Sequence, residues 1–107
     1  MQAWLLLVAA IVLEVAGTTS MKLSQGFART LPSIMIFVFY ALSFVAMTFA
    51  LRRLDLSIAY AIWAGVGTVL ITLIGFIYFT EQATLFKAAC IALIVLGVVG
   101  LSYAAEA

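Results

Sequence analysis

The residue whose position most directly indicates chemistry is Glu14, the one charged side chain among residues 1–21. At 1.5 Å per residue, Glu14 lies about 20 Å along a helix that begins near residue 1, close to the middle of a bilayer. An acid at that depth costs about 2.5–3.5 kcal/mol on insertion scales and normally marks an ion or proton pathway. Such a carboxyl can carry a proton or neutralise a cation. The alternative is a structural carboxyl, protonated and hydrogen-bonded between helices.

Small and polar residues share the helical face of Glu14. Ala10, Gly17 and Thr18 lie three or four residues away from it, which places them beside the carboxyl on a helix. Their small size lets another helix or a ligand come close to Glu14, so we expect Ala10 and Gly17 to line a substrate pocket beside it. The alternative is helix packing alone, because small residues are common at helix contacts in membranes.

Two groups of aromatic residues are spaced to form one face each. Tyr60, Trp63 and Gly67 share a helical face at spacings of three and four. They could form an aromatic surface for an organic cation, each contact contributing about 0.5–2 kcal/mol, or they could belong to the interfacial belt. Gly65 and Gly67 indicate a bend or a close crossing in that helix.

The second group lies earlier in the chain, where Tyr40, Ser43 and Phe44 share a face. Ser43 could donate a hydrogen bond to a carboxyl, or to a carbonyl of its own helix.

The composition of the chain indicates which secondary structure carries these residues. Of the 107 residues, 68% are apolar and 8% charged, which excludes an ordinary soluble domain and a disordered chain. We expect an all-α integral membrane protein, one domain over residues 1–107, with helices at about 3–21, 31–51, 57–79 and 85–103. The long, continuously apolar runs differ from the alternating segments of a β-barrel.

Several functional classes are excluded by the residues that the chain lacks. It contains no His and one Cys, Cys90, so we expect neither an internal disulfide nor a Cys/His metal site. A net charge of +1 without a basic patch argues against nucleic-acid binding. No phosphate loop or nucleophile triad is present, so we expect neither an enzyme nor a cofactor.

The charges of the predicted loops leave the orientation nearly undecided. Arg52 and Arg53 lie on the side of both termini, whereas Lys22, Arg29 and Lys87 lie on the other side. Two against three is almost no positive-inside bias, which is either accidental or indicates that copies of the chain insert both ways. The fourth segment carries small residues suited to helix contact, namely Ala89, Cys90, Ala92, Gly97 and Gly100.

Together these motifs resemble the small multidrug resistance family over essentially the whole chain. The motifs are Glu14-Val15-x-Gly17-Thr18-Thr19-x-Met21-Lys22, Gly26-Phe27-x-Arg29 with Pro32-Ser33, Tyr40-x-x-Ser43-Phe44, and Ala59-Tyr60-Ala61-Ile62-Trp63-x-Gly65-Val66-Gly67. The resemblance implies a proton-coupled exporter of the bacterial inner membrane that works as an antiparallel dimer. It assigns proton and cation binding to Glu14 and the substrate pocket to Thr18, Tyr40, Ser43, Phe44, Tyr60 and Trp63. On the fourth helix, Gly97 and Cys90 would make the dimer contact.

The resemblance also indicates the substrate class. Gly17-Thr18 and Tyr40 look like the branch that exports quaternary ammonium compounds and multiple drugs. The alternative is a guanidinium or polyamine exporter, either alone or as one subunit of a heterodimer. Residues 52–57 support it, because they resemble the same segment in subunits of paired spermidine exporters. In either case proton and cation would compete for Glu14 of both protomers, which gives antiport when the site faces one side at a time.

Overall fold

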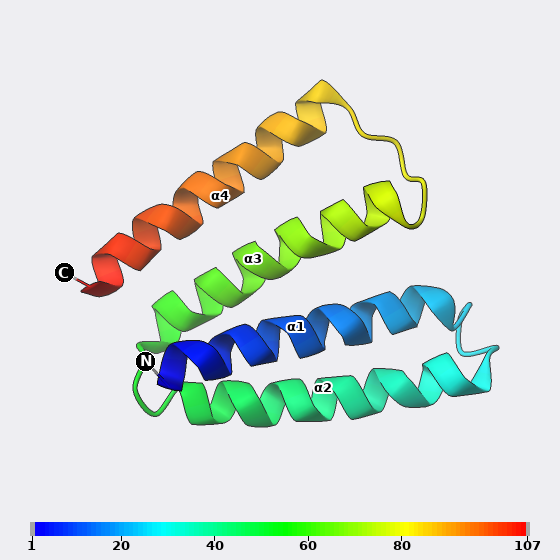
Figure 1. Cartoon of the computed structure of the whole chain (residues 1–107), viewed down its shortest axis with the longest axis horizontal. Coiled ribbons are helices and arrows are strands. Elements are labelled where there is room, and N and C mark those ends of the chain that lie inside the picture. Colours follow the sequence, from blue (N-terminus) through cyan, green and yellow to red (C-terminus); the bar gives the residue numbers. More distant parts are fainter. Residues whose placement is uncertain (1, 107) are drawn as a thin grey trace. The chain divides into compact units, whose positions relative to one another are not determined.

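The computed structural model describes residues 2–106 and contains four helices (Figure 1). These are α1 (Gln2–Leu23), α2 (Thr30–Ala50), α3 (Leu56–Ile77) and α4 (Leu85–Glu106). All four are long and apolar enough to cross a membrane. The predicted all-α class with four spans is therefore confirmed.

The helices differ from the predicted ranges by two or more residues at three ends. Helix α1 continues to Leu23, two residues past its predicted end. Helix α3 ends at Ile77, two residues before the predicted end, and Thr80 adopts a positive φ of 53° that a continuing helix does not allow. Helix α4 continues to Glu106, three residues past the predicted end, because Ala104 and Ala105 are good helix formers.

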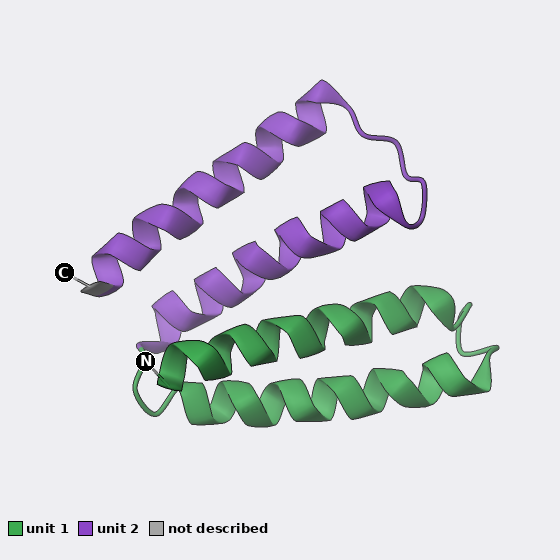
Figure 2. Cartoon of the chain, viewed as in Figure 1, with its two compact units in different colours: residues 1–54 green, residues 55–107 purple. Residues whose placement is uncertain are grey.

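The chain divides into two compact units, residues 1–54 and residues 55–107 (Figure 2). The first unit is the antiparallel hairpin of α1 and α2, whose helices pack against each other along their length. Small residues allow this close packing, since Ala10, Ser43 and Ala50 are completely buried. Leu7, Ile11 and Ile36 fill the remaining interface.

A tight turn connects α1 to α2. Gln25, Gly26 and Phe27 all have positive φ values, between 51° and 70°. The hydroxyl of Ser24 accepts a hydrogen bond from the backbone N–H of Phe27 at 3.2 Å and donates to the carbonyl of Met21 at 2.8 Å. These bonds satisfy backbone groups left free where α1 ends.

The second unit is the hairpin of α3 and α4. The two helices are in close contact at Gly65, where a Cβ atom would overlap the Val98 side chain. A bend and a close crossing are the two roles predicted for Gly65. The contact with Val98 favours the close crossing. No residue in the most apolar stretch of Leu85–Ala105 is buried. Most of the α4 surface is therefore not covered by α3.

Candidate functional site

Glu14 is part of a chain of polar side chains between α1 and α2. The hydroxyl of Thr18 donates to Glu14 Oε1 at 2.9 Å. The hydroxyl of Tyr40, on α2, lies 2.6 Å from Thr18 Oγ1. All three residues are partly buried, so the hairpin does not enclose the carboxyl completely.

The helical spacing places these groups together. Thr18 is one turn after Glu14, so the two side chains lie on one face of α1. Tyr40 reaches the same face because Gly17 leaves room for its ring: a Cβ atom at Gly17 would lie 3.0 Å from Tyr40 Cδ1 and Cε1. The absent side chain of Gly17 thus positions the Tyr40 ring over α1.

Tyr40 also contacts two residues besides Thr18. Its ring is stacked with that of Phe44, at a centroid distance of 6.0 Å and an interplanar angle of 10°. Its hydroxyl lies 3.6 Å from Met21 Sδ, within reach of a weak hydrogen bond. Met21 was not among the predicted site residues, although its position seven residues after Glu14 puts it on the same helical face.

Ser43 and Ala10 lie in the interior of the hairpin. The Ser43 hydroxyl donates to the carbonyl oxygen of Ala10 at 2.7 Å, and both residues have no exposed surface. This bond crosses from α2 to α1, so it is neither of the two bonds considered for Ser43 from the sequence. In this arrangement the hydroxyl holds the two helices in register.

The aromatic residues of α3 form a pair within the second unit. Tyr60 and Trp63 pack edge to face with a centroid distance of 5.3 Å. Tyr60 is 58% exposed, and the buried Nε1–H of Trp63 has no hydrogen-bond partner among the described residues. Gly67 is buried on the same helix. An aromatic pair with one exposed ring offers a π surface to a cation.

The residues expected at a dimer contact lie on the exposed side of α4. Cys90 is a free, exposed thiol. A Cβ atom added at Gly97 or at Gly100 would meet nothing within 4 Å. This surface is therefore available to another helix.

Comparison with known proteins identifies the family. The family model described as "Small Multidrug Resistance protein" matches residues 2–94. The chain is 48% identical over 99 residues to the uncharacterized membrane protein YvaE of Bacillus subtilis, covering 92% of this chain and 83% of that protein.

Two further relatives carry functional names. The quaternary ammonium compound-resistance protein QacE of Escherichia coli is 36% identical over 107 residues, which is 100% of this chain and 97% of QacE. A guanidinium exporter of Yersinia pseudotuberculosis is 37% identical over 102 residues, or 95% of this chain and 98% of that protein. The chain therefore belongs to the small multidrug resistance family of multi-pass membrane transporters.

Proposed function

We propose that this chain is a proton-coupled antiporter that exports hydrophobic or quaternary ammonium cations, with Glu14 binding either a proton or the cation. Membership of the small multidrug resistance family makes it a cation or drug exporter rather than an enzyme. The observation that carries the finer proposal is the hydrogen-bonded chain from Glu14 through Thr18 to Tyr40. It gives an acid of a membrane-spanning helix polar partners without neutralising its charge.

The hydroxyl chain suits both protonation states of Glu14. When the carboxyl is ionised, Tyr40 donates to Thr18 and Thr18 donates to Glu14. When the carboxyl is protonated it can donate to Thr18, Thr18 can donate to Tyr40, and Tyr40 can donate to Met21 Sδ. The same side chains therefore stay hydrogen-bonded through a cycle of proton uptake and release, as an exchanger requires.

The aromatic side chains support an organic cation as the substrate. Tyr60 with Trp63 and Tyr40 with Phe44 are two aromatic pairs that include exposed rings. Aromatic faces bind quaternary ammonium groups readily, because these cations have no hydrogen-bond donors that need partners. A strongly hydrated cation would lose hydrogen bonds to water that an aromatic face does not replace. We infer that an antiparallel dimer supplies two copies of Glu14 and of these pairs, because one four-helix chain encloses little volume.

The second candidate is a guanidinium or polyamine exporter, with a heterodimer as its possible assembly. Its support is the guanidinium exporter of Yersinia pseudotuberculosis, whose identity of 37% is as high as the 36% of QacE. Overall similarity thus does not select the substrate, whereas the residues around Glu14 favour the quaternary ammonium class.

Transport by the purified full chain distinguishes the two candidates. Proteoliposomes with an acidic interior are given tetraphenylphosphonium or guanidinium outside, and uptake is measured against liposomes without protein. We expect accumulation of tetraphenylphosphonium that collapses when the pH gradient is dissipated. Accumulation of guanidinium alone would establish the second candidate instead, and transport of neither would contradict homodimeric export.

A further inference from the structure

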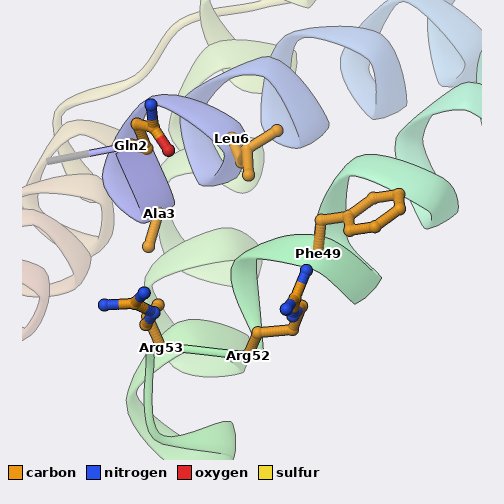
Figure 3. A pocket seen from close by; sticks show the side chains of 6 residues that line it. All are labelled: Gln2, Ala3, Leu6, Phe49, Arg52 and Arg53. Carbon is orange, nitrogen blue, oxygen red and sulfur yellow. The ribbon is translucent and has the colours of Figure 1, made fainter.

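A cavity separate from the Glu14 site opens at the end of the first hairpin, where α1 begins and α2 ends. It has a volume of about 610 Å³, and Figure 3 shows the six side chains that line it: Gln2, Ala3, Leu6, Phe49, Arg52 and Arg53. All six belong to the first unit. A volume of this size is typical of sites for small ligands.

The lining carries positive charge and no negative charge. Two of the six residues, Arg52 and Arg53, are cations, and none is an acid. The first turn of α1, which begins at Gln2, adds backbone N–H groups without helical partners and the positive end of the helix dipole. Guanidinium groups bind phosphate oxygens with paired hydrogen bonds, so this cavity is suited to a phosphate group.

The position of the cavity at the ends of the two helices indicates where the phosphate group comes from. Helix α1 has 22 residues and α2 has 21, so each spans about 30 Å, the thickness of the hydrocarbon core. The start of α1 and the end of α2 therefore lie at the level of the lipid headgroups. Basic pockets between membrane helices at this depth are suited to anionic headgroups.

An apolar surface continues from the charged cavity along the same hairpin. A second, shallow cavity of about 330 Å³ is lined by Gln2, Leu5 and Leu6, and it shares Gln2 and Leu6 with the first. Leu5 is 63% exposed and Phe49 is 50% exposed. A free phosphate ion would leave this surface unused, whereas the acyl chain of a lipid would cover it.

We propose that the α1–α2 hairpin binds one anionic phospholipid, with its phosphate between Arg52 and Arg53 and an acyl chain against Leu5, Leu6 and Phe49. The two arginines then have two roles: they bind a lipid headgroup, and they contribute to the orientation in which the chain inserts. The site is independent of Glu14, so it holds whichever cation the protein exports.

Native mass spectrometry of the detergent-solubilised full chain tests this site. The protein is mixed with equimolar phosphatidylglycerol and phosphatidylcholine of matched acyl chains, and in a separate arm with inorganic phosphate. We expect phosphatidylglycerol to be retained preferentially, and the Arg52→Gln/Arg53→Gln variant to lose that preference. Each single variant should lose about fivefold, the effect of one basic residue near an anionic lipid.

The matched control is the Lys22→Gln/Arg29→Gln variant, which removes two exposed positive charges at the opposite end of the same hairpin. It should retain the preference for phosphatidylglycerol, and circular dichroism should show equal helix content in every variant. If the control lost the preference for phosphatidylglycerol to the same extent, net charge alone would explain the effect and the proposed site would be wrong. Equal retention of phosphatidylcholine, or displacement of phosphatidylglycerol by inorganic phosphate, would also overturn it.

Discussion

The hydroxyl oxygens of Thr18 and Tyr40 lie 2.6 Å apart and connect α1 to α2 one helical turn from Glu14. Thr18 is therefore the link through which a residue of the second helix acts on the carboxyl. When Thr18 donates its one proton to Glu14, its oxygen accepts the hydrogen bond from Tyr40. A side chain with the same shape but no hydroxyl would leave Glu14 and Tyr40 without a common partner.

Replacing Thr18 with Val tests this link. The change keeps the shape of the side chain and removes its hydroxyl, so Glu14 loses a hydrogen bond of the strength typical for charged acceptors, about 1.5–3 kcal/mol. We expect tetraphenylphosphonium binding to change its pH dependence and the coupling ratio of protons to cation to fall. The control is Thr19→Val, since Thr19 donates to the Val15 carbonyl of its own helix. Identical pH profiles for Thr18→Val and the wild type would contradict the link.

Replacing Gly17 with Ala tests how Tyr40 is positioned. The added methyl group would lie 3.0 Å from two ring carbons of Tyr40, so the ring must shift by a few tenths of an ångström, which disturbs its contact with Thr18. We expect destabilisation of about 1–3 kcal/mol, the usual cost of overpacking, together with weaker cation binding.

A double-mutant cycle checks the origin of that cost. In a Tyr40→Leu background the methyl group meets no ring, so Gly17→Ala should cost much less in thermal unfolding of the detergent-solubilised protein. Equal costs in both backgrounds would show that Gly17 serves only the backbone of α1.

The sequence predicts the elements of this fold well because their physical cause is local. Charges bound four apolar runs, and a run of about 20 such residues in lipid forms a helix whatever its neighbours are. The spacing of Glu14 and Thr18 likewise predicts that the two side chains lie side by side on one helical face, and the structure joins them by a hydrogen bond.

Contacts between helices could not be predicted in the same way. The bonds from Tyr40 to Thr18 and from Ser43 to Ala10 depend on the register of α1 against α2, which packing determines. The cavity beside Arg52 and Arg53 arises because the start of α1 and the end of α2 come together, although they are about 50 residues apart in the sequence. The pocket roles of Tyr60 and Trp63 and the antiparallel dimer stay predictions.

The aromatic pair of α3 should bind the cation through its rings. We expect Trp63→Ala to lower the affinity for tetraphenylphosphonium at least tenfold, because it removes one partner of the pair and its π face. Tyr60→Phe keeps the ring and should have a milder effect. Isothermal titration calorimetry in detergent measures both affinities. An unchanged affinity for Trp63→Ala would assign that residue to the interfacial belt.

The loop charges should determine how the chain inserts. The three cations Lys22, Arg29 and Lys87 oppose Arg52 and Arg53, so the wild type should insert in both orientations. The variant Arg52→Ser/Arg53→Ser should favour termini outside, and an added Lys near Ala105 should favour termini inside. Each biased form alone should export poorly, and co-expression of the two should restore export.

Labelling of a terminal cysteine from each side of the membrane measures the orientation. Because Cys90 is exposed in this chain, it is first replaced by Ser so that only the added cysteine reacts. Labelling of the wild type from one side only would contradict dual insertion and would indicate a subunit that needs a different partner chain.

If one carboxyl binds proton and cation alternately, removing its charge in the Glu14→Gln variant should abolish coupled transport. In proteoliposomes with an acidic interior, the wild type should accumulate tetraphenylphosphonium, and its binding should weaken as the pH falls because protonation removes the counter-charge. Glu14→Gln should insert and dimerise as the wild type does, yet show no uptake driven by the pH gradient. Uphill uptake by Glu14→Gln at the wild-type rate would contradict the account.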